Sequence, residues 1–430
     1  MMNIIIIGAG AAGLMAAHLL SAQGHTVTLL EARDRTGGRI HTLQEGRFSK
    51  PVDLGAEFVH GNLPITLGLL KEAGISYHAL EGEMWHFREG RFYQDEENAE
   101  HWGLLMQKLD ALEEDLPIRT FLTQEFPGER YSAFRESIER YVQGLDAADP
   151  SEASSIALRE EWNGEDEDQY AIEGGYGRLI HYLENRCRAQ GVTIQLNSPV
   201  SNIDWQEGSV NVRTVSGNEY EADKLIVTVP IGVLQAATGA EGALQFAPGL
   251  PAYLAAAKEI GSGNALKILL QFREPFWKKL HGHDLEKMSF LLSTASIPTW
   301  WTQYPQSSSL LTGWLGGPRA YEMKDISQEE MLHKCLLSLS EIFGMPAAAI
   351  QELLDDWRMH PWPADPYSRG SYSYAKVGTP KALSVLATPV ASTIYFAGEA
   401  IYDGHAMGTV EAALSSGQDA VQRLLKGTEA

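Results

Sequence analysis

Three glycines near the start of the chain have a spacing that suits the binding of a phosphorylated ligand. Gly8, Gly10 and Gly13 form the pattern G-x-G-x-x-G between a run of isoleucines and an alanine-rich segment. We expect Gly8 to permit a tight turn, Gly10 to let the backbone approach a pyrophosphate, and Gly13 to let a helix pack closely on a strand. The amino end of that helix, at Ala11 and Ala12, offers free N–H groups to negative charge.

A carboxylate and a second glycine pair follow at fitting distances. Glu31 ends the alternating stretch HTVTLLE, about twenty residues beyond the glycines, where an acid that binds a ribose belongs. Arg33, Gly38 and Arg39 come next, in LEARDRTGGRI. A glycine there allows another close backbone approach, and an arginine supplies a cation for the pyrophosphate. The stretch therefore predicts a bound dinucleotide, and a strand–helix turn without a ligand is the alternative.

One lysine stands where an apolar residue is expected. Lys267 interrupts the apolar run from Ala265 to Phe272 in NALKILLQFREPFW. A lysine inside a buried strand must pair with an acid, extend to solvent or lose its proton. Spacing alone favours the second of these, with Lys267 reaching out from an edge strand.

These blocks, together with VDLGAEFVHG and HPWPADPYSRGSYSY, resemble the flavin amine oxidase family: monoamine oxidases, polyamine oxidases and lysine-specific histone demethylases. The resemblance extends almost from end to end. It implies an α/β fold, with a discontinuous, Rossmann-like FAD-binding domain and an α+β substrate domain of mixed sheet and helices. It also implies an enzyme that binds FAD and oxidises a C–N bond of an amine to an imine, with O2 reduced to H2O2.

The resemblance adds cofactor-binding positions beyond the glycine motif. In the family, the block at 52–61 lines the inner edge of the flavin, the segment VTIQLNSPV holds the adenine through its backbone, and aromatic residues pack around the ring. An acid lies near the pyrophosphate, and the amino end of the last helix faces flavin O2 and N1, where reduction leaves negative charge. The positions assigned in this way are Gly55, Ala56, Glu57, Phe58, Val200, Trp362, Tyr367, Glu399, Thr409 and Val410.

Three residues are candidates for catalysis by the same resemblance. Lys267 would hold a water against flavin N5, and would orient the substrate, assist flavin oxidation, or both. Tyr372 would form one wall of an aromatic cage, whose flat faces suit an aliphatic cation. His60 would bind or deprotonate a distal amine, or it is a histidine that is merely satisfied in a loop.

Two positions depart from the monoamine oxidases. Those enzymes carry their covalent flavin cysteine where this chain has Ser371, so the resemblance implies noncovalent FAD. Their second cage tyrosine aligns with Thr409. The cage would therefore keep one aromatic wall, at Tyr372, and have a small residue at the other, so we expect the entrance of the cage to be wider. This pattern is closer to the demethylases and counts against a monoamine substrate. The expected substrate is a polyamine or a related secondary amine, because His60 and the acidic surface favour a multiply charged molecule.

Three rival functions stay open. An L-amino acid oxidase needs an arginine aimed at a carboxylate, and Arg319 and Arg369 are the candidates. A primary-amine or monoamine oxidase would accept Thr409 only with a reshaped cage. A catalytically silent flavin-binding scaffold is the third rival, which Lys267 and Tyr372 argue against. His405 is expected to be an ordinary loop residue, and HGHD at 281–284 a solvated loop with no metal.

The elements that position these residues alternate in type along the chain. Segments 1–76, 168–239 and 379–430 are expected to form the FAD-binding domain, with strands at Asn3–Ile7 and Ile394–Ala397 and a last helix from Thr409. Segments 77–167 and 240–378 would form the substrate-binding domain. Its strands are expected in SFLLST, TWWTQ and SLLTGWLGG, with helices before and after them.

Composition limits the class of partner. The 430-residue chain has a formal net charge of -22, which repels nucleic acid and attracts cationic small molecules. No apolar run reaches the roughly 18–20 residues that span a bilayer, and we expect neither a membrane partner nor a secretion signal. Cys187 and Cys335 suggest neither a disulfide framework nor a zinc site, which predicts the cytoplasm. The oligomeric state is left open.

Overall fold

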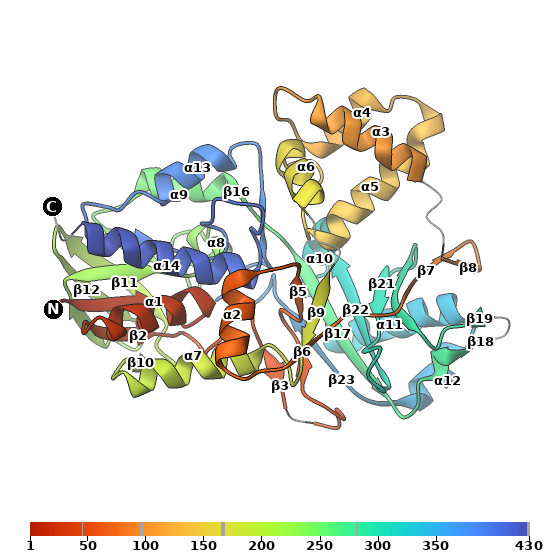
Figure 1. Ribbon diagram of the computed structural model, residues 1–430, viewed down its shortest axis with the longest axis horizontal. Coiled ribbons are helices and arrows are strands. Elements are labelled where there is room, and N and C mark those ends of the chain that lie inside the picture. The colour runs from red at the N-terminus through yellow and green to blue at the C-terminus, as the bar shows by residue number, and fades with distance from the viewer. Residues whose placement is uncertain (45, 95–98, 165–167, 281–282, 428–430) are drawn as a thin grey trace.

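Two large sheets divide the molecule into two lobes, and a group of helices stands beside the second lobe (Figure 1). The computed structural model describes residues 1–44, 46–94, 99–164, 168–280 and 283–427. Both chain ends lie in the first lobe, far from the second sheet (Figure 1). The two lobes therefore face each other across the middle of the molecule.

The first lobe is built on a parallel five-stranded sheet in the order β10-β2-β1-β14-β25. Parallel strands covered on both faces consist of nearly continuous apolar runs, and Ile4 to Ile7 are all buried. The strands are β1 (Asn3–Ile7), β2 (Thr26–Leu30), β10 (Thr193–Gln195), β14 (Lys224–Val227) and β25 (Ile394–Phe396). The strands expected at both ends of the chain are thus confirmed.

Helices cover one face of this sheet and a meander covers the other. The helices α1 (Ala11–Ala22), α7 (Gly177–Ala189) and α14 (Val410–Lys426) pack together over the core that contains Ile4 and Ile6. The opposite core contains Ile5 and residues of a mixed four-stranded sheet. That sheet comprises β11 (Val200–Gln206), β12 (Ser209–Thr214), β13 (Glu219–Ala222) and β15 (Gln245–Ala247), of which only β15 runs parallel to its neighbour. This lobe is the Rossmann-like one.

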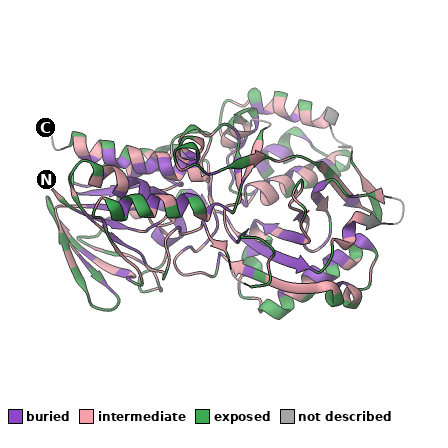
Figure 2. Cartoon of the chain, turned by 60° about the horizontal axis from the view of Figure 1, so that its bottom comes forward, coloured by how far each residue is buried: buried purple, intermediate pink, exposed green. Residues whose placement is uncertain are grey.

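The second lobe is a mixed seven-stranded sheet in the order β23-β17-β22-β21-β20-β7-β8. Its strands are β7 (Glu83–Arg88), β8 (Arg91–Tyr93), β17 (Ala265–Phe272), β20 (Met288–Ser293), β21 (Thr299–Trp301), β22 (Leu310–Gly316) and β23 (Leu354–Pro361). Pairing is antiparallel except between β20 and β7. Helices α11 (Gln328–Phe343) and α12 (Ala347–Leu353) add apolar side chains to its core. Among its strands, β17 and β22 are almost wholly buried, whereas β23, β7 and β8 are mostly intermediate or exposed (Figure 2).

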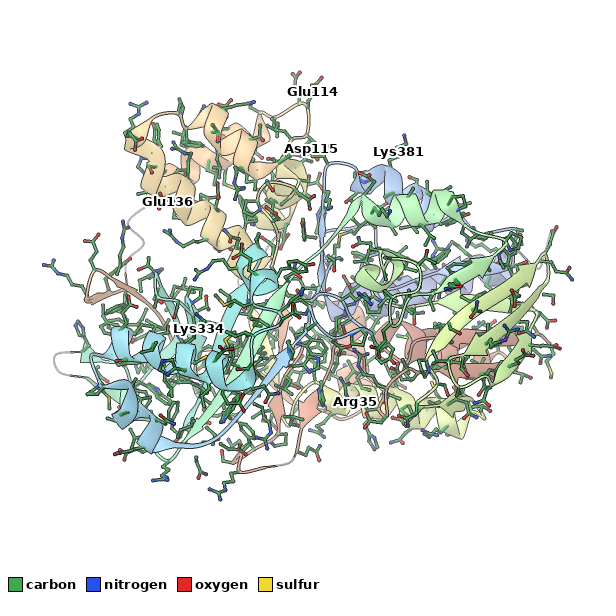
Figure 3. The ribbon with its side chains drawn as sticks, turned by 180° about the vertical axis from the view of Figure 1, so that it is seen from behind. Arg35, Glu114, Asp115, Glu136, Lys334 and Lys381 are labelled. Atoms are coloured by element: carbon green, nitrogen blue, oxygen red, sulfur yellow. The ribbon has the colours of Figure 1, made fainter. Side chains whose placement is uncertain are left out.

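The helical group forms a small core of its own. It consists of α3 (Ala99–Asp110), α4 (Ile118–Glu125), α5 (Ser132–Leu145) and α6 (Ser155–Gly164). Helices were expected before the strands of the second sheet, and α3 and α4 are two of them. The second one begins after Pro117, its N-cap, because a proline cannot donate within a continuing helix. In Figure 3, Glu114, Asp115 and Glu136 belong to this group.

Short elements link the lobes. Strands β5 (Phe58–His60), β6 (Tyr77–Ala79) and β9 (Gln169–Ile172) form one small sheet, while β3 (Thr42–Leu43) pairs with β4 (Val52–Asp53) and β16 (Ile260–Ser262) with β24 (Ser373–Ala375). Short helices are α2 (Pro64–Glu72), α8 (Ile231–Leu234), α9 (Pro251–Lys258), α10 (Pro318–Glu322) and α13 (Thr379–Leu386).

The mixed α/β fold class is confirmed by this architecture, whereas the domain limits stay a prediction. The strands of the parallel sheet come from all three segments assigned to the FAD-binding domain. Within the part of the chain that the structure describes, no helix combines the length and apolar character that crossing a bilayer requires.

Candidate active site

One cavity of about 1650 Å³ runs between the two lobes and takes its wall from both. Nearly all the residues that the sequence assigned to the site lie in this wall, although they come from distant parts of the chain. They are Gly8, Gly10, Ala11, Ala12, Glu31, Arg33, Gly38, Arg39, Gly55, Ala56, Glu57, Phe58, His60, Val200, Lys267, Trp362, Tyr367, Tyr372, Glu399, Thr409 and Val410.

The three motif glycines have different surroundings. A Cβ on Gly13 would lie 1.9 Å from the carbonyl oxygen of Gly8, so Gly13 is a packing position and is not part of the cavity wall. A Cβ on Gly10 would meet no described heavy atom within 4 Å. Gly8 has a φ of 103°, which glycine adopts readily. The space above Gly10, at the amino end of α1, therefore suits the close approach of a phosphate.

The acid at the end of β2 is held by backbone N–H groups. Glu31 is buried, and its carboxylate accepts from the N–H of Ala9 at 2.8 Å and from that of Arg33 at 2.9 Å. These two contacts fix the carboxylate beside the glycine loop. An acceptor in that place suits the hydroxyl groups of a ribose.

Two of the predicted cations bind acids of this chain. Arg39 forms an ion pair with Glu399, with 2.8 Å between Nη2 and Oε1, and also donates to the carbonyl oxygen of Ser371. Arg33 donates to both oxygens of Asp365, at 2.9 and 2.8 Å. Both arginines therefore fasten the segment after β23 to the nucleotide lobe.

Asp365 is the centre of a polar network that reaches Trp362 through His360. Burial acts to raise its pKa, but the hydrogen bond to His360 and the charge of Arg33 outweigh burial and hold the pKa well below its ordinary value. His360 Nε2 lies 3.0 Å from Asp365, and the His360 ring packs on Trp362 with 4.0 Å between ring centroids. The Trp362 indole donates to the carbonyl oxygen of Leu54 at 3.1 Å. The network thus fixes the orientation of Trp362.

Lys267 is buried and paired. It lies on β17, between β22 and β23, and is 1% exposed, so the alternative of a lysine at a sheet edge is wrong. Its Nζ is 2.6 Å from Oε2 of Glu57 and 3.0 Å from the carbonyl oxygen of Gly55. Trp301 lies beneath the ammonium, 5.4 Å from Nζ to the ring centroid. The charge of this lysine therefore stays in the cavity wall.

A second carboxylate lies close to this pair but outside the cavity wall. Burial raises the pKa of Asp53 to about 7, although the charge of Lys267 and a hydrogen bond from Thr42 lower it. The backbone N–H of Tyr176 also donates to Asp53, at 3.3 Å. Near neutral pH this acid therefore holds its proton for part of the time.

Aromatic rings form a larger part of the chamber than the sequence suggested. The rings of Tyr372 and Trp314 are nearly parallel, with 8° between planes and 6.3 Å between centroids. The Trp314 indole donates to the carbonyl oxygen of Gly144 at 2.7 Å, and the Tyr372 hydroxyl donates to that of Leu145. Both polar tips are thus held by adjacent carbonyls at the end of α5, and Trp314 supplies an aromatic surface in addition to the wall expected from Tyr372.

His60 and Tyr372 line the chamber as uncharged groups. The His60 side chain is exposed to the cavity but shielded from bulk solvent, which lowers its pKa from the ordinary value of 6.5, while a hydrogen bond with Gln169 raises the pKa by a smaller amount. Burial, followed by the charges of Asp146 and Glu161, raises the pKa of Tyr372 far above its ordinary value. A neutral imidazole can accept a hydrogen bond or a proton from an amine.

The last helix begins where the sequence placed it. Thr409 is the N-cap of α14, its hydroxyl accepts from the N–H of Ala412 at 3.1 Å, and Val410 is the first helical residue. Both residues line the cavity. The positive end of the helix dipole is therefore directed at the chamber.

The residues tied to the rival functions are placed as follows. Arg319 lines the cavity and donates to the carbonyl oxygen of Ser296 at 3.2 Å, whereas Arg369 is not in the wall and donates to the carbonyl oxygen of Glu241 at 2.6 Å. His405 lies in the wall. In HGHD, residues 281–282 lie outside the described residues, and no group of three or more potential metal ligands gathers within the described ranges.

Sequence reasoning missed Trp301, Gln303, Trp314 and Asp53. Each lies in the chamber wall or contacts a residue of that wall because strands pair or distant segments meet. Residue spacing along the sequence does not predict such contacts. The signals were indirect: TWWTQ and SLLTGWLGG were expected to be strands of the same domain as Lys267, and Asp53 belongs to the block VDLGAEFVHG that was assigned to the flavin.

The fold and cavity together fit one class of protein: a nucleotide-binding oxidoreductase, with a glycine cradle at a helix end in its Rossmann-like lobe and a chamber lined by aromatic residues in its second lobe. The chain belongs to the flavin-containing amine oxidoreductase family, whose profile matches residues 11–425. The cradle at Gly10, the acid at Glu31 and the helix end at Thr409 fit a flavin nucleotide that lies along the cavity.

Similar proteins include a rice enzyme, polyamine oxidase 4, which is 28% identical and covers 96% of this chain and 87% of its own length. Human lysine-specific histone demethylase 2 is 31% identical over 96% of this chain, which spans only 52% of that larger protein. Cyclohexylamine oxidase from Brevibacterium oxydans has the same fold, with a TM-score of 0.81 at 21% identity over 100% of both chains. Putrescine oxidase also shares it, with a TM-score of 0.80 at 20% identity over 99% of each chain.

Proposed function

We propose that the protein binds FAD noncovalently and oxidises a C–N bond of a polyamine or a similar secondary amine, with O2 as the acceptor and H2O2 as a product. The observation that carries the proposal is the single cavity that joins the glycine loop at Gly10 to Lys267 and Tyr372. A nucleotide bound at one end would direct its reactive end to the other.

The bound cofactor would supply the acceptor for a hydride equivalent from the carbon next to the amine nitrogen, and water would then hydrolyse the resulting iminium to an aldehyde and a smaller amine. The chain supplies orientation and an enclosed site. Tyr372 and Trp314 present flat faces to the alkyl chain, and Lys267 holds a donor in the wall. His60, kept neutral, would accept a hydrogen bond from a distal amine.

Charge supports a substrate with more than one amine. The chain as a whole carries a net charge of -22, and a negatively charged protein raises the local concentration of a cation. The cavity wall itself holds both signs, because basic side chains such as Arg88, Arg140 and Arg319 line it together with acids. The acids of the wall, apart from Glu31, Glu57 and Glu399, are Asp115, Asp146, Glu160, Glu161 and Asp403.

Noncovalent binding is supported by the thiols and by Ser371. The described wall residues include Ser371 and no cysteine. Cys187 is buried against the carbonyl oxygen of Leu14, and Cys335 lies in the core of the second lobe. Both thiols are unpaired, which also supports our proposal of a reducing compartment such as the cytoplasm.

A peroxide-coupled screen tests the proposal. The purified protein, supplied with FAD, would be offered spermine, spermidine, acetylated polyamines, monoamines and L-amino acids. We expect turnover with a polyamine, and turnover with none of the amines would contradict an oxidase. Because Arg319 lines the cavity, L-amino acid oxidation is the second candidate, and a response to amino acids alone would favour it.

A further inference from the structure

The Glu57 side chain is held by donors from the opposite lobe. Lys267 Nζ lies 2.6 Å from its Oε2. Gln303 Nε2 donates to its Oε1 at 2.9 Å, and Trp301 Nε1 lies 3.2 Å from Oε2. Glu57 itself belongs to the segment between β4 and β5, and its side chain is 11% exposed. The carboxylate is therefore fixed from several directions.

Within the described part of the chain, the ammonium of Lys267 forms an ion pair with one anion, Glu57. Its other hydrogen-bond acceptor is the neutral carbonyl of Gly55, and its remaining neighbour is the face of Trp301. A buried charge is strongly disfavoured unless an opposite charge compensates it. Glu57 is thus the group that balances the lysine at the cavity wall.

We propose that Glu57 is a positioning residue, which holds Lys267 Nζ in the chamber wall and cancels its charge, so that the wall presents a fixed donor with no net charge. This inference rests on the proposed function, because it concerns how the lysine faces the cofactor. The FAD would then experience a neutral pair, and removing either partner alone would leave an uncompensated charge beside it.

Other titratable groups face the same pair. Asp53 lies behind it, close enough for its charge to couple to Lys267 and Glu57. His360 is the strand partner of Lys267 on β23 and is hydrogen-bonded to Asp365. Neither makes a direct hydrogen bond to Lys267 among the described contacts. All comparisons below are therefore made at one fixed pH.

The first experiment is a double-mutant cycle on the unfolding of the purified full-length protein. Lys267→Met and Glu57→Gln each leave one buried charge without its partner, so each should shift the unfolding equilibrium strongly. The double variant should lose less than the sum of the two, by about tenfold or more in the equilibrium constant. Additive losses would overturn the pairing.

The second experiment measures the reduction midpoint potential of the bound FAD. Lys267→Met exposes the negative charge of Glu57, which disfavours adding electrons, so the potential should become more negative. Adding Glu57→Gln to that variant should return it toward the wild-type value. Equal potentials in the single and double variants would show that Glu57 presents no charge to the flavin. That result would overturn the proposal and leave Glu57 with a purely structural role, as a contact between the lobes.

Glu83 provides the matched control. Its carboxylate also accepts from a tryptophan indole, that of Trp85 at 3.2 Å, and from a glutamine amide, that of Gln94 at 2.8 Å, but it lies outside the cavity wall. Glu83→Gln should leave the potential unchanged, with and without Lys267→Met. Failure of the protein to bind FAD would refute the proposed function, whereas the unfolding cycle would still test the pair.

Discussion

The two ends of the cavity are built in different ways. At the nucleotide end, the chain offers backbone: a glycine turn, the amino end of α1 and one acid that backbone N–H groups fix in place. At the chamber end, the chain offers side chains. Lys267 pairs with Glu57, and Trp314 lies parallel to Tyr372, although the four residues come from separate segments. One end is thus encoded locally and the other only by the tertiary fold.

This difference teaches where a substitution acts. A change at the nucleotide end alters space next to the backbone, so it should affect folding or cofactor affinity. A change at the chamber end alters charge or an aromatic face, so it should affect chemistry while the cofactor stays bound, and stability as well where it changes a buried charge.

Gly13→Ala should have the largest effect. Its new methyl group would lie 1.9 Å from the carbonyl oxygen of Gly8, which is backbone and cannot move aside cheaply. We expect a loss of more than about 4 kcal/mol of unfolding free energy, or no folded protein. Chemical denaturation followed by circular dichroism would measure it.

Gly10→Ala is the control for that variant. No described atom lies within 4 Å of its new methyl group, so the stability should change by no more than about 1 kcal/mol. The FAD dissociation constant should nevertheless rise, because the methyl group occupies the space for the pyrophosphate. Equal losses of stability in the two variants would contradict the claim that Gly13 serves packing whereas Gly10 serves binding.

Lys267→Met should slow turnover by about a hundredfold or more, the scale seen when one preorganised donor is removed from an active site. The protein should remain yellow, because the glycine loop and Glu31 are untouched. Steady-state rates and the FAD content of the purified variant would be measured together. Lys381→Met, on the exposed side chain labelled in Figure 3, should leave both unchanged. If the variant lost its bound FAD together with its activity, the claim that Lys267 acts on chemistry and not on FAD binding would be wrong.

Asp53→Asn should change how stability depends on pH. The folded-state pKa of about 7 exceeds the ordinary value of 3.8, so the unfolded chain loses its proton first as the pH rises. The wild-type protein should therefore lose stability between about pH 4 and 7, by up to about 1.4 kcal/mol per pH unit, and little more above that window.

The asparagine variant should show a smaller decline across the same window. Urea unfolding at several pH values would test this against the wild-type protein. If the free energy of unfolding depended on pH in the same way in both proteins, Asp53 would ionise with its ordinary pKa. That result would contradict the raised pKa of this buried carboxylate behind Lys267.

Trp314→Phe should have the smallest of these effects. It removes the hydrogen bond to Gly144 but keeps an aromatic face, so we expect a rise of KM of about tenfold or less, the size of about 1.4 kcal/mol. Initial rates over a range of polyamine concentrations would measure it. Trp314→Leu should weaken binding further, and equal KM values in both variants would argue against an aromatic contact with the amine.

The sequence predicted the two ends of the site to different depths. The glycine loop, Glu31 and the start of the last helix follow from local spacing, and the structure has these elements at the predicted residues. For Lys267, local sequence predicted an apolar strand but not its central place in the sheet. The sequence did not show that Glu57 pairs with Lys267 or that Trp314 lies parallel to Tyr372, because both depend on how distant segments meet.

The central claim is that an amine in the aromatic chamber reacts with a flavin that extends from the glycine loop. The most direct test is to mix the FAD-loaded protein with spermidine in the absence of oxygen and to record its visible absorbance. We predict that the yellow absorbance is bleached and that it returns when air is admitted, with the FAD released intact on denaturation. A protein that takes up no FAD, or that stays yellow with every polyamine offered, would contradict the account.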